Sequence, residues 1–388
     1  MITRVEELFL KLISSAVTGK PLDGISLSAE DADGLYRLAD RHDLCHLVYY
    51  ALSEAKIEIE SFQAGSLMEQ KYLKAIRRGA RTDYAFSMAK ELLAKAGIPY
   101  IPLKGVVINK LYPERWMRTS SDVDILVRKE DYKKAVDVFG GDARFEKGRE
   151  CEHHYEFITE KKVRIELHRA LMDEHDYKAA DVVDDIWKSA SCPVQGGMEY
   201  QMSDGWFYYH HILHMLMHFE RGGIGVRFFA DTWLLNRDAS EETRKEREKY
   251  LEGGGLARFA KAVEQLSDIW MNANRPTSPA LLTMEKLVLS GGIFGTTEQR
   301  VQYGSQKAGG RARYLLTRIF TPYNRLKLIY PVIGKHPALT PLFQVVRWFR
   351  ILLRPRQSLA GDEIRTMIKG GKVSDDEIKE MRQDLGLL

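Results

Sequence analysis

Apolar residues in the first 62 positions recur three or four apart, which is the spacing of one buried stripe on each of several short helices. Leu8 and Leu12 belong to the first of these stripes. Similar spacing continues from residue 66 to residue 96 and stops at Gly97, a residue type common at helix ends. The pattern therefore predicts a helical cap over residues 1–62, followed by one long helix.

Strand and helix patterns alternate in the next part of the chain. Apolar runs predict strands at residues 100–103, 123–127, 154–158 and 163–167, and helical spacing predicts helices at 106–112 and 131–139. The last two strands flank a polar turn at residues 159–162, so they are predicted to form a hairpin. Together with the long helix, this alternation predicts an α+β core over residues 63–175.

Helical patterns dominate after about residue 175. They predict helices at 205–219, 228–235, 243–251, 256–271 and 280–289, and the glycine-rich stretches 253–255 and 304–310 predict loops. Ser374 and Glu377 have the spacing of a capping box, which predicts a short helix near the end. The predicted fold class is α+β, a small mixed sheet with an N-terminal helical cap and a large C-terminal helical region over residues 176–388.

Composition places the chain among ordinary globular proteins. Of its 388 residues, 44% are hydrophobic and 29% are charged, which excludes a collagen-like or wholly disordered chain. The net charge of +4 is too small to indicate nucleic-acid binding by itself. The motifs GxxxxGKS/T, GxGxxG, HExxH and GxSxG are absent, so the common ATPase, dehydrogenase and hydrolase classes lack support.

Cysteine usage and the start of the chain bear on location. Cys45, Cys151 and Cys192 are far apart and form no CxxC pair, so no disulfide framework or cysteine zinc site is predicted. Glu6 and Lys11 give the first apolar stretch a character unlike that of a secretory signal. No window approaches eighteen uninterrupted apolar residues, so no transmembrane helix is predicted. We expect a cytoplasmic protein.

The most informative segment is the predicted strand that contains Asp122 and Asp124. Because side chains alternate across a strand, these two carboxylates share one face, while Val123 and Ile125 point into the core. Two like charges so close together repel each other, and a divalent cation would relieve that repulsion. Oxygen ligands alone favour magnesium or manganese. The pair therefore predicts a metal site.

Glu166 supplies a third carboxylate. It alternates with the apolar Ile165 and Leu167 on a strand that could lie beside the first, so three acids could hold two metal ions. The alternative is that Asp122 caps a turn and that Asp124 and Glu166 are solvated strand positions. The metal interpretation requires Glu166 on the same side of the sheet as the aspartates. It also requires that no lysine or arginine fill the position of the cation.

A second group of residues predicts a phosphate site. Lys104 and Gly105 end a predicted strand and open a predicted helix, where backbone N–H groups and the helix dipole favour an anion. Gly105 would let a phosphate approach the backbone closely, and Lys104 would neutralise its charge. Arg118, four residues before Asp122, is a further candidate.

The motifs between residues 103 and 127 resemble those of a known family. Their order is Leu103-Lys104-Gly105, Leu111-Tyr112-Pro113, Arg118, and then Asp122-x-Asp124 followed by Ile-Leu-Val. This order is similar to that of the uncharacterised nucleotidyltransferase family of the polymerase-beta-like superfamily. The resemblance extends over most of the chain and is strongest between residues 99 and 170. Where the superfamily usually has a Gly-Ser or Gly-Gly turn, this chain has Lys104-Gly105, which this particular family tends to carry.

The resemblance implies an enzyme that uses magnesium or manganese to transfer a nucleoside monophosphate from an NTP such as ATP to an acceptor, with release of pyrophosphate. It implies that Asp122 and Asp124 bridge metal and phosphate and that Glu166 holds the metal that activates the nucleophile. The residues expected to contact the nucleotide are Lys104, Gly105, Arg118, Ser121 and His168. The acceptor stays open among a small molecule, a sugar, a protein and an RNA. The alternative is a non-catalytic protein that retains the fold and binds nucleotide or RNA.

Four-residue spacing puts several polar side chains on shared helix faces. His210, His214 and His218 share one face of a predicted helix. Zinc binding, substrate contact and structural packing are all open for them, and structural packing is favoured. Arg227 and Asp231 are four apart on the next predicted helix, where an ion pair is expected.

Histidines also fall near the ends of the predicted hairpin strands. His153 and His154 lie at the start of the first strand, and His168 follows the second. Hairpin pairing brings such ends together, so these three side chains are candidates to line the site. A structural role is the default for each.

The segment from residue 311 to residue 356 mixes arginines with aromatic residues. This mixture is found in RNA-binding surfaces and in amphipathic helices that rest on anionic membranes. The favoured interpretation is an ordinary pair of amphipathic helices whose apolar side is buried. RNA binding and peripheral membrane contact stay open as the less favoured alternatives.

Overall fold

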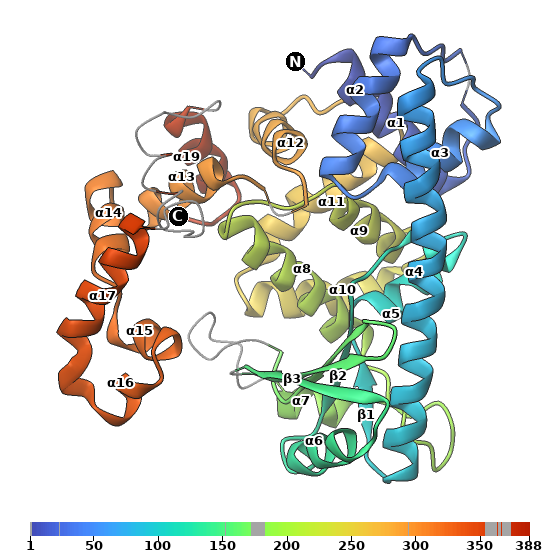
Figure 1. Ribbon diagram of the computed structural model, residues 1–388. Coiled ribbons are helices and arrows are strands. Elements are labelled where there is room, and N and C mark those ends of the chain that lie inside the picture. The colour runs from blue at the N-terminus through green and yellow to red at the C-terminus, as the bar shows by residue number, and fades with distance from the viewer. Residues whose placement is uncertain are drawn as a thin grey trace. The chain divides into compact units, whose positions relative to one another are not determined.

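The computed structural model describes residues 2–22, 24–151, 153–171, 183–293, 295–353, 363, 366 and 374–388. The chain forms two compact units (Figure 1). The first unit comprises Met1–His214 and Arg227–Pro276, and the second comprises Met215–Val226 and Thr277–Leu388. Helix α8 (Asp204–Glu220) contributes to both, because the division falls within it.

The N-terminal helices form as predicted. They are α1 (Arg4–Thr18), α2 (Ala29–Arg41) and α3 (Cys45–Glu54), and capping boxes begin α1 and α2. The long helix α4 (Phe62–Lys95) begins four residues before the predicted start and ends just ahead of Gly97. Its early start follows from the side chain of Ser61, which caps the first turn.

A five-stranded mixed sheet forms the centre of the first unit, so the predicted α+β class is confirmed. The strands are β1 (Tyr100–Pro102), β2 (Asp122–Val127), β3 (Phe145–Glu150), β4 (His154–Thr159) and β5 (Arg164–His168), in the order β1-β2-β5-β4-β3. Strands β2 and β5 are parallel, and every other pair is antiparallel. The hairpin β4–β5 is as predicted. Strand β3 was missed, because only Phe145 of this edge strand is buried and no apolar alternation marks it.

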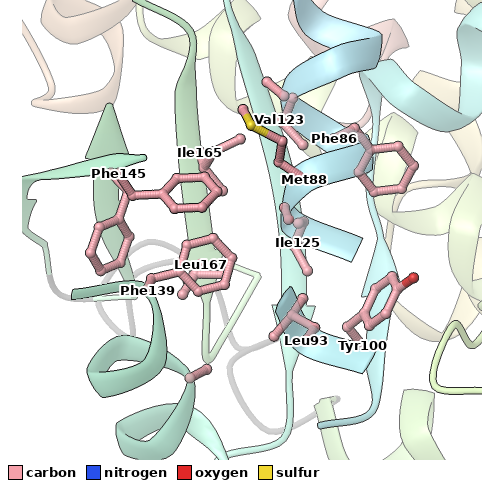
Figure 2. Packing of buried hydrophobic residues seen from close by; sticks show 14 of the residues in the cluster. Phe86, Met88, Leu93, Tyr100, Val123, Ile125, Phe139, Phe145, Ile165 and Leu167 are labelled. Carbon is pink, nitrogen blue, oxygen red and sulfur yellow. The ribbon is translucent and has the colours of Figure 1, made fainter. Parts of the chain in front are cut away.

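The two faces of the sheet differ in chemistry. Val123, Ile125, Ile165 and Leu167 point to one face and pack with side chains of α4 and α6 (Tyr132–Gly141), as Figure 2 shows. Each fully buried aliphatic side chain there stabilises the fold by roughly 1.5–3 kcal/mol. The other face carries the acids and histidines of β2, β4 and β5. Because the apolar face must be buried, it fixes the register of the strands. That register determines which polar side chains lie beside one another on the other face.

Short helices connect β1 to β2, and a larger helical group completes the first unit. The connection contains α5 (Gly105–Ile108) and the 3₁₀ turns η1 (Asn109–Leu111) and η2 (Arg115–Met117). The group comprises α7 (Val183–Ser189), α8, α9 (Arg227–Arg237), α10 (Glu241–Gly253) and α11 (Ala257–Met271). Helix α11 packs against both α9 and α1, and Ser14 Oγ donates a hydrogen bond to the carbonyl of Met271. The predicted helices of this region are confirmed within a few residues at each end.

The described residues of the second unit form helices and connecting turns, and no strand. Its helices are α12 (Pro279–Gly291), α13 (Thr297–Lys307), α14 (Arg311–Ile319), α15 (Tyr323–Ile329), α16 (Val332–Lys335), α17 (Thr340–Leu353) and α19 (Asp375–Asp384), with the 3₁₀ turn η4 (Pro337–Leu339). The capping box at Ser374 begins α19 as predicted. The loop predicted over 304–310 is wrong at its start, because Gly304 lies inside α13 against the ring of Tyr314.

The predictions about residues 253–255 and about membrane-spanning helices can also be compared with the structure. The glycine-rich stretch 253–255 does form the end of α10 and the turn after it. Among the described residues, no helix combines the length and the apolar character needed to cross a bilayer.

Candidate active site

Asp124 and Glu166 lie directly beside each other on the parallel strands β2 and β5. Side chains alternate along a strand, so Asp122 points to the same face as Asp124. Val123 and Ile125 are fully buried on the other face. The structure therefore places the three predicted carboxylates on one side of the sheet, as the metal interpretation requires, but among the described residues no candidate metal group of three side chains includes Asp122.

Lys104 and His168 both bind the innermost carboxylate. Asp124 is 3% exposed, and its Oδ1 accepts hydrogen bonds from Lys104 Nζ at 3.0 Å and from His168 Nε2 at 2.9 Å. His168 Nε2 also lies 3.5 Å from Glu166 Oε2. A lysine thus lies beside the carboxylate where the metal interpretation required none. Lys104, expected to neutralise a phosphate, neutralises Asp124 in this structure.

Burial and charge together set the protonation of this cluster. Burial by itself would raise the pKa of Asp124, but Lys104 and His168 outweigh it and hold that pKa well below its usual range. Burial opposes the charged form of His168, yet its contacts with Asp124 and Glu166 raise its pKa. Burial would also raise the pKa of Glu166, but His168 more than offsets it, so that pKa is lowered. The two acids are therefore held in their ionised form by neighbouring positive charge.

Asp122 is the carboxylate that lacks such a partner. It accepts a hydrogen bond from Ser120 Oγ at 2.8 Å, and within the described part of the chain no basic side chain forms an ion pair with it. Burial raises the pKa of Asp122, and the charge of Asp124 raises it further. A cation beside Asp122 would relieve both effects, so the cluster has room for one more positive charge.

The donor set fits a hard divalent cation. Carboxylate oxygens suit magnesium and manganese, and Asp122, Asp124 and Glu166 offer them on one face. One ligand atom each from Asp124, Glu166 and His168 also lie within 4.8 Å of one another. Lys104 competes for Oδ1 of Asp124, so a metal bound at that oxygen requires the lysine to move.

The turn at Lys104 and Gly105 is tightly packed. Lys104 has a φ of 45°, in the left-handed region that non-glycine residues seldom adopt. A Cβ on Gly105 would lie 2.9 Å from Arg118 Nη1 and 2.9 Å from Ser120 Oγ, so a glycine is needed for these side chains to approach. Helix α5 is a single turn, shorter than the helix predicted over 106–112, so its dipole contributes little to anion binding.

Arg118 is committed to a buried ion pair. Its Nε and Nη2 donate to both carboxylate oxygens of Asp231 on α9 at 2.9–3.1 Å, and Tyr112 donates to the same carboxylate at 2.8 Å. The ion pair expected between Arg227 and Asp231 was therefore wrongly assigned, since Arg227 donates to the carbonyl of Thr119 instead. Arg118 connects the loop before β2 to α9, and its contact with a nucleotide stays a prediction.

Two residues of the polar face, Ser120 and Glu156, were not predicted from the sequence. Ser120 rather than Ser121 holds Asp122, and Ser121 is exposed. On β4, Glu156 pairs with Glu166 and His154 pairs with His168. The predicted β4–β5 hairpin contained a signal for Glu156. Once the register of the hairpin is known, alternation along β4 shows which of its residues share a face with Glu166.

His210 of α8 lies near the carboxylate cluster, since the charges of Lys104, Asp124 and His168 act on it. His210 is buried, and burial together with the charge of Lys104 lowers its pKa to about 3. His211 is also buried, with a pKa of about 4 caused by burial, and its Nε2 bonds Thr232 Oγ1. Among the described residues, no group of three metal-binding side chains includes His210, His214 or His218. Buried and neutral, His210 fits the packing role that was favoured for this face of α8.

Comparison with known proteins identifies a family model that matches this chain. A family model described as an uncharacterised nucleotidyltransferase matches residues 28–272, which is more than half of the chain. The matched range includes β1 to β5 and the helices α2 to α11, so it covers every residue of the carboxylate cluster. A search of curated proteins and a search of solved structures each found no match.

Proposed function

The chain belongs to the uncharacterised nucleotidyltransferase family, and we propose that it transfers a nucleoside monophosphate from an NTP to an acceptor, with release of pyrophosphate. The observation that carries the proposal is the placement of Asp122, Asp124 and Glu166 on one face of the sheet, on adjacent parallel strands. Asp122 has no basic partner among the described residues, which supports a site built to take a further cation.

The metal would be magnesium or manganese, held by Asp122, Asp124 and Glu166. When bound, it would neutralise the triphosphate and lower the pKa of the acceptor's hydroxyl group. The carboxylate oxygens of these residues suit either ion. ATP is one of the NTPs that such a site would accept.

Lys104 has a specific part in this proposal. Its ammonium group pairs with Asp124, and the four-carbon stem allows it to reach a second partner. Lys104 would have to release Asp124 for that carboxylate to hold the cation, and its ammonium group would then be available to donate to a phosphate oxygen. The lysine thereby keeps the charge of the cluster balanced before and after the nucleotide binds.

Glu166 receives the proton in the proposed reaction. The acceptor's oxygen attacks the α-phosphorus, the bond between the α-phosphorus and the bridging oxygen breaks, and pyrophosphate leaves with that electron pair. Glu166 accepts the proton of the acceptor's hydroxyl group at a carboxylate oxygen, which its lowered pKa keeps ionised beforehand. His168 holds this carboxylate in place through its own contact with Asp124.

The test uses NTPs labelled at the α-phosphate. The protein is incubated with each NTP, magnesium or manganese, and a panel of sugars, small hydroxyl compounds, proteins and RNA, and labelled adduct and pyrophosphate are measured. Asp124→Asn should lower turnover by several orders of magnitude. Asp137→Asn, on the exposed side of α6, is the matched control and should react as the unaltered protein does. Equal turnover for Asp124→Asn would refute the assignment.

One observation favours a second candidate. The ion pair between Lys104 and Asp124 fills part of the proposed cation position, as it would in a protein that binds nucleotide or RNA without catalysis. Such a protein would bind an NTP equally well with and without magnesium. Formation of any labelled adduct by the unaltered protein but not by Asp124→Asn would exclude it.

A further inference from the structure

Three histidines meet at the ends of β4 and β5, beside the carboxylate cluster. His154 and His168 are cross-strand partners, and His153 immediately precedes β4. Their ring centroids are 4.4–5.5 Å apart, and one ring nitrogen from each lies within 4.8 Å of the others. Three imidazoles at this separation have the composition of a transition-metal site with an open fourth position.

The ring nitrogens of two of these histidines lack partners in the described part of the chain. His154 is only 8% exposed, and neither of its ring nitrogens has a hydrogen bond. Nδ1 of His168, which is 1% exposed, also lacks one. The nearest carboxylate oxygens lie 3.7 Å and 3.9 Å from His154 Nε2, too far for a hydrogen bond. Buried polar atoms nearly always have a hydrogen-bond partner, so the lack of one at these nitrogens indicates that they bind a ligand.

The second nitrogen of His168 is already oriented as in a metal site. His168 Nε2 donates to Asp124, which fixes the ring, and Nδ1 has no hydrogen-bond partner among the described residues, so a metal could bind there by displacing its proton. Metal-binding histidines commonly donate their other N–H to a carboxylate in this way. His153 is partly exposed, so an ion could reach the cluster from that side.

We propose that His153, His154 and His168 bind a divalent transition metal ion, with zinc as the first choice. Imidazole nitrogens favour zinc over magnesium, so this site is distinct in its ion from the carboxylate site of the proposed function. The bound ion would take one unpartnered ring nitrogen of His154 and Nδ1 of His168 as ligands, and would tie the ends of β4 and β5 together. The proposal does not depend on nucleotidyl transfer.

Cobalt provides the test, because Co²⁺ in a site of imidazoles gives a visible absorption band. The protein is stripped with chelator, titrated with Co²⁺ in excess magnesium, and then titrated with Zn²⁺ to displace the cobalt. His153→Ala and His154→Ala should each weaken cobalt binding about 10- to 100-fold. His336→Ala, an exposed histidine of the second unit, is the matched control and should leave the titration unchanged.

Other outcomes separate this site from the carboxylate site. Asp122→Asn should bind cobalt as the unaltered protein does. Equal loss in Asp122→Asn and His154→Ala would place the ion on the carboxylates and overturn the proposal, and so would cobalt binding that survives both histidine substitutions. Circular dichroism of each variant shows that it is folded. A failure to bind cobalt would not affect the result of the labelled-NTP experiment, since that experiment measures nucleotidyl transfer.

A second inference rests on the outer surface of α17. Leu342, Val345, Val346, Phe349 and Leu353 follow helical spacing along one face and are 39–79% exposed. The opposite face makes the contacts, since Gln344, Arg347 and Trp348 donate hydrogen bonds to backbone carbonyls of residues 318–321. The favoured interpretation of this segment, in which the apolar side is buried, is therefore wrong for α17. Its apolar stripe faces outward.

The helices before α17 also expose apolar side chains. Leu316 and Phe320 at α14, Ile329 of α15 and Val332 of α16 are also exposed. Residues 299–361 contain no aspartate or glutamate, although the whole chain has 54 in 388 residues. The same stretch contains twelve basic residues: Arg300, Lys307, Arg311, Arg313, Arg318, Arg325, Lys327, Lys335, Arg347, Arg350, Arg354 and Arg356. This part of the chain is thus both apolar on its surface and uniformly basic.

We infer that α14–α17 dock on the surface of a bilayer that contains anionic lipid. Helices that lie on membranes have lysine and arginine beside an exposed face of aliphatic and aromatic residues. The absence of acidic residues matches a negatively charged partner. RNA is the less suitable partner, because base stacking uses aromatic rings and most exposed apolar residues here are aliphatic.

Co-sedimentation with lipid vesicles tests this inference. The full chain should bind vesicles of phosphatidylcholine and phosphatidylglycerol, and should bind vesicles of phosphatidylcholine alone much more weakly. Phe349→Glu should lower the bound fraction at least tenfold. Phe62→Glu is the matched control, because Phe62 is 90% exposed on α4 of the first unit, and it should bind as the unaltered protein does.

Two results would overturn the inference. One is equal sedimentation with neutral and anionic vesicles or with neither. The other is that the protein does not bind anionic vesicles but binds RNA in a salt-sensitive manner, and that Phe349→Glu weakens this RNA binding. Both variants change exposed residues, so their folding can be verified by thermal melting before the lipid is added.

Discussion

Lys104 Nζ donates a hydrogen bond to Asp124 Oδ1 at 3.0 Å, so the lysine that follows β1 neutralises the innermost carboxylate of β2. Burial opposes the charge of Lys104, but Asp124 outweighs it and raises the pKa of the lysine. Both groups are therefore charged. For the nucleotide to bind as proposed, a metal would have to replace Lys104 at Asp124, and a phosphate would have to replace Asp124 at Lys104.

Removal of this lysine separates metal binding from nucleotide binding. Lys104→Met should bind Mn²⁺ at least as tightly as the unaltered protein, because the cation that competes for Asp124 is gone. The same variant should bind an NTP about 10- to 100-fold more weakly, the effect of losing one charge-assisted hydrogen bond of roughly 1.5–3 kcal/mol. Titration of Mn²⁺ by electron paramagnetic resonance and of NTP by calorimetry measures the two effects. Loss of Mn²⁺ binding in Lys104→Met would contradict the proposed exchange of partners.

The buried ion pair between Arg118 and Asp231 should be important for stability. Asp231→Asn leaves the guanidinium of Arg118 buried without its counter-charge, so we expect a loss of about 3–5 kcal/mol in the free energy of unfolding. Urea unfolding followed by circular dichroism measures it. Asp238→Asn, whose carboxylate is exposed beside Arg237, is the control and should change little. A loss for Asp231→Asn no larger than that of the control would show that the buried pair is dispensable.

Gly105 should tolerate no side chain. In Gly105→Ala the new Cβ would meet Arg118 Nη1 and Ser120 Oγ at 2.9 Å, and Arg118 is held in place by Asp231. We expect a destabilisation of about 1–3 kcal/mol together with weaker NTP binding, since Ser120 positions Asp122. Gly141→Ala is the matched control, because nothing lies within 4 Å of a Cβ at that position. Thermal melting with and without NTP compares the two, and equal behaviour would mean that the turn can relax.

The buried histidines of α8 should make the protein less stable in mild acid. His210 and His211 have pKa values of about 3 and about 4, below their value of about 6.5 in an unfolded chain. Between about pH 4 and pH 6.5 the unfolded state binds protons that the folded state does not, so stability falls as the pH falls. Each histidine contributes up to about 1.4 kcal/mol per pH unit. His168 does not add to this slope, because its raised pKa keeps it protonated in both states below pH 6.5.

A single substitution isolates one of these contributions. His211→Gln keeps a donor for Thr232 Oγ1 but does not titrate, so its unfolding free energy should depend less steeply on pH between 4 and 6.5. Urea unfolding at several pH values gives the slope for both proteins. An unchanged slope would show that His211 is protonated in the folded state.

Sequence patterning predicted the architecture well where burial was one-sided. The alternation of Asp122, Asp124 and Glu166 with apolar neighbours fixed their common face, because the apolar side had to enter the core. The edge strand β3 escaped notice, since five of its six residues are exposed and no alternation exists to detect.

Contacts between distant segments were beyond the reach of the pattern. Asp231 was assigned to Arg227 four residues away, whereas the fold brings Arg118 to it from 113 residues away. The exposed apolar stripe of α17 has the same spacing as a buried one, and only the contacts of Gln344, Arg347 and Trp348 show which side faces inward. Local spacing defines a helix face but does not identify what covers it.

The most direct test of the carboxylate site is the thermal stability of the protein with each NTP, in the presence and absence of magnesium. The account predicts that an NTP and magnesium together raise the melting temperature more than either does alone, and that Asp122→Asn and Asp124→Asn abolish this joint effect while Asp137→Asn retains it. Stabilisation by NTP that is the same without magnesium, or that survives both aspartate substitutions, would contradict the claim that these acids hold a metal–nucleotide pair.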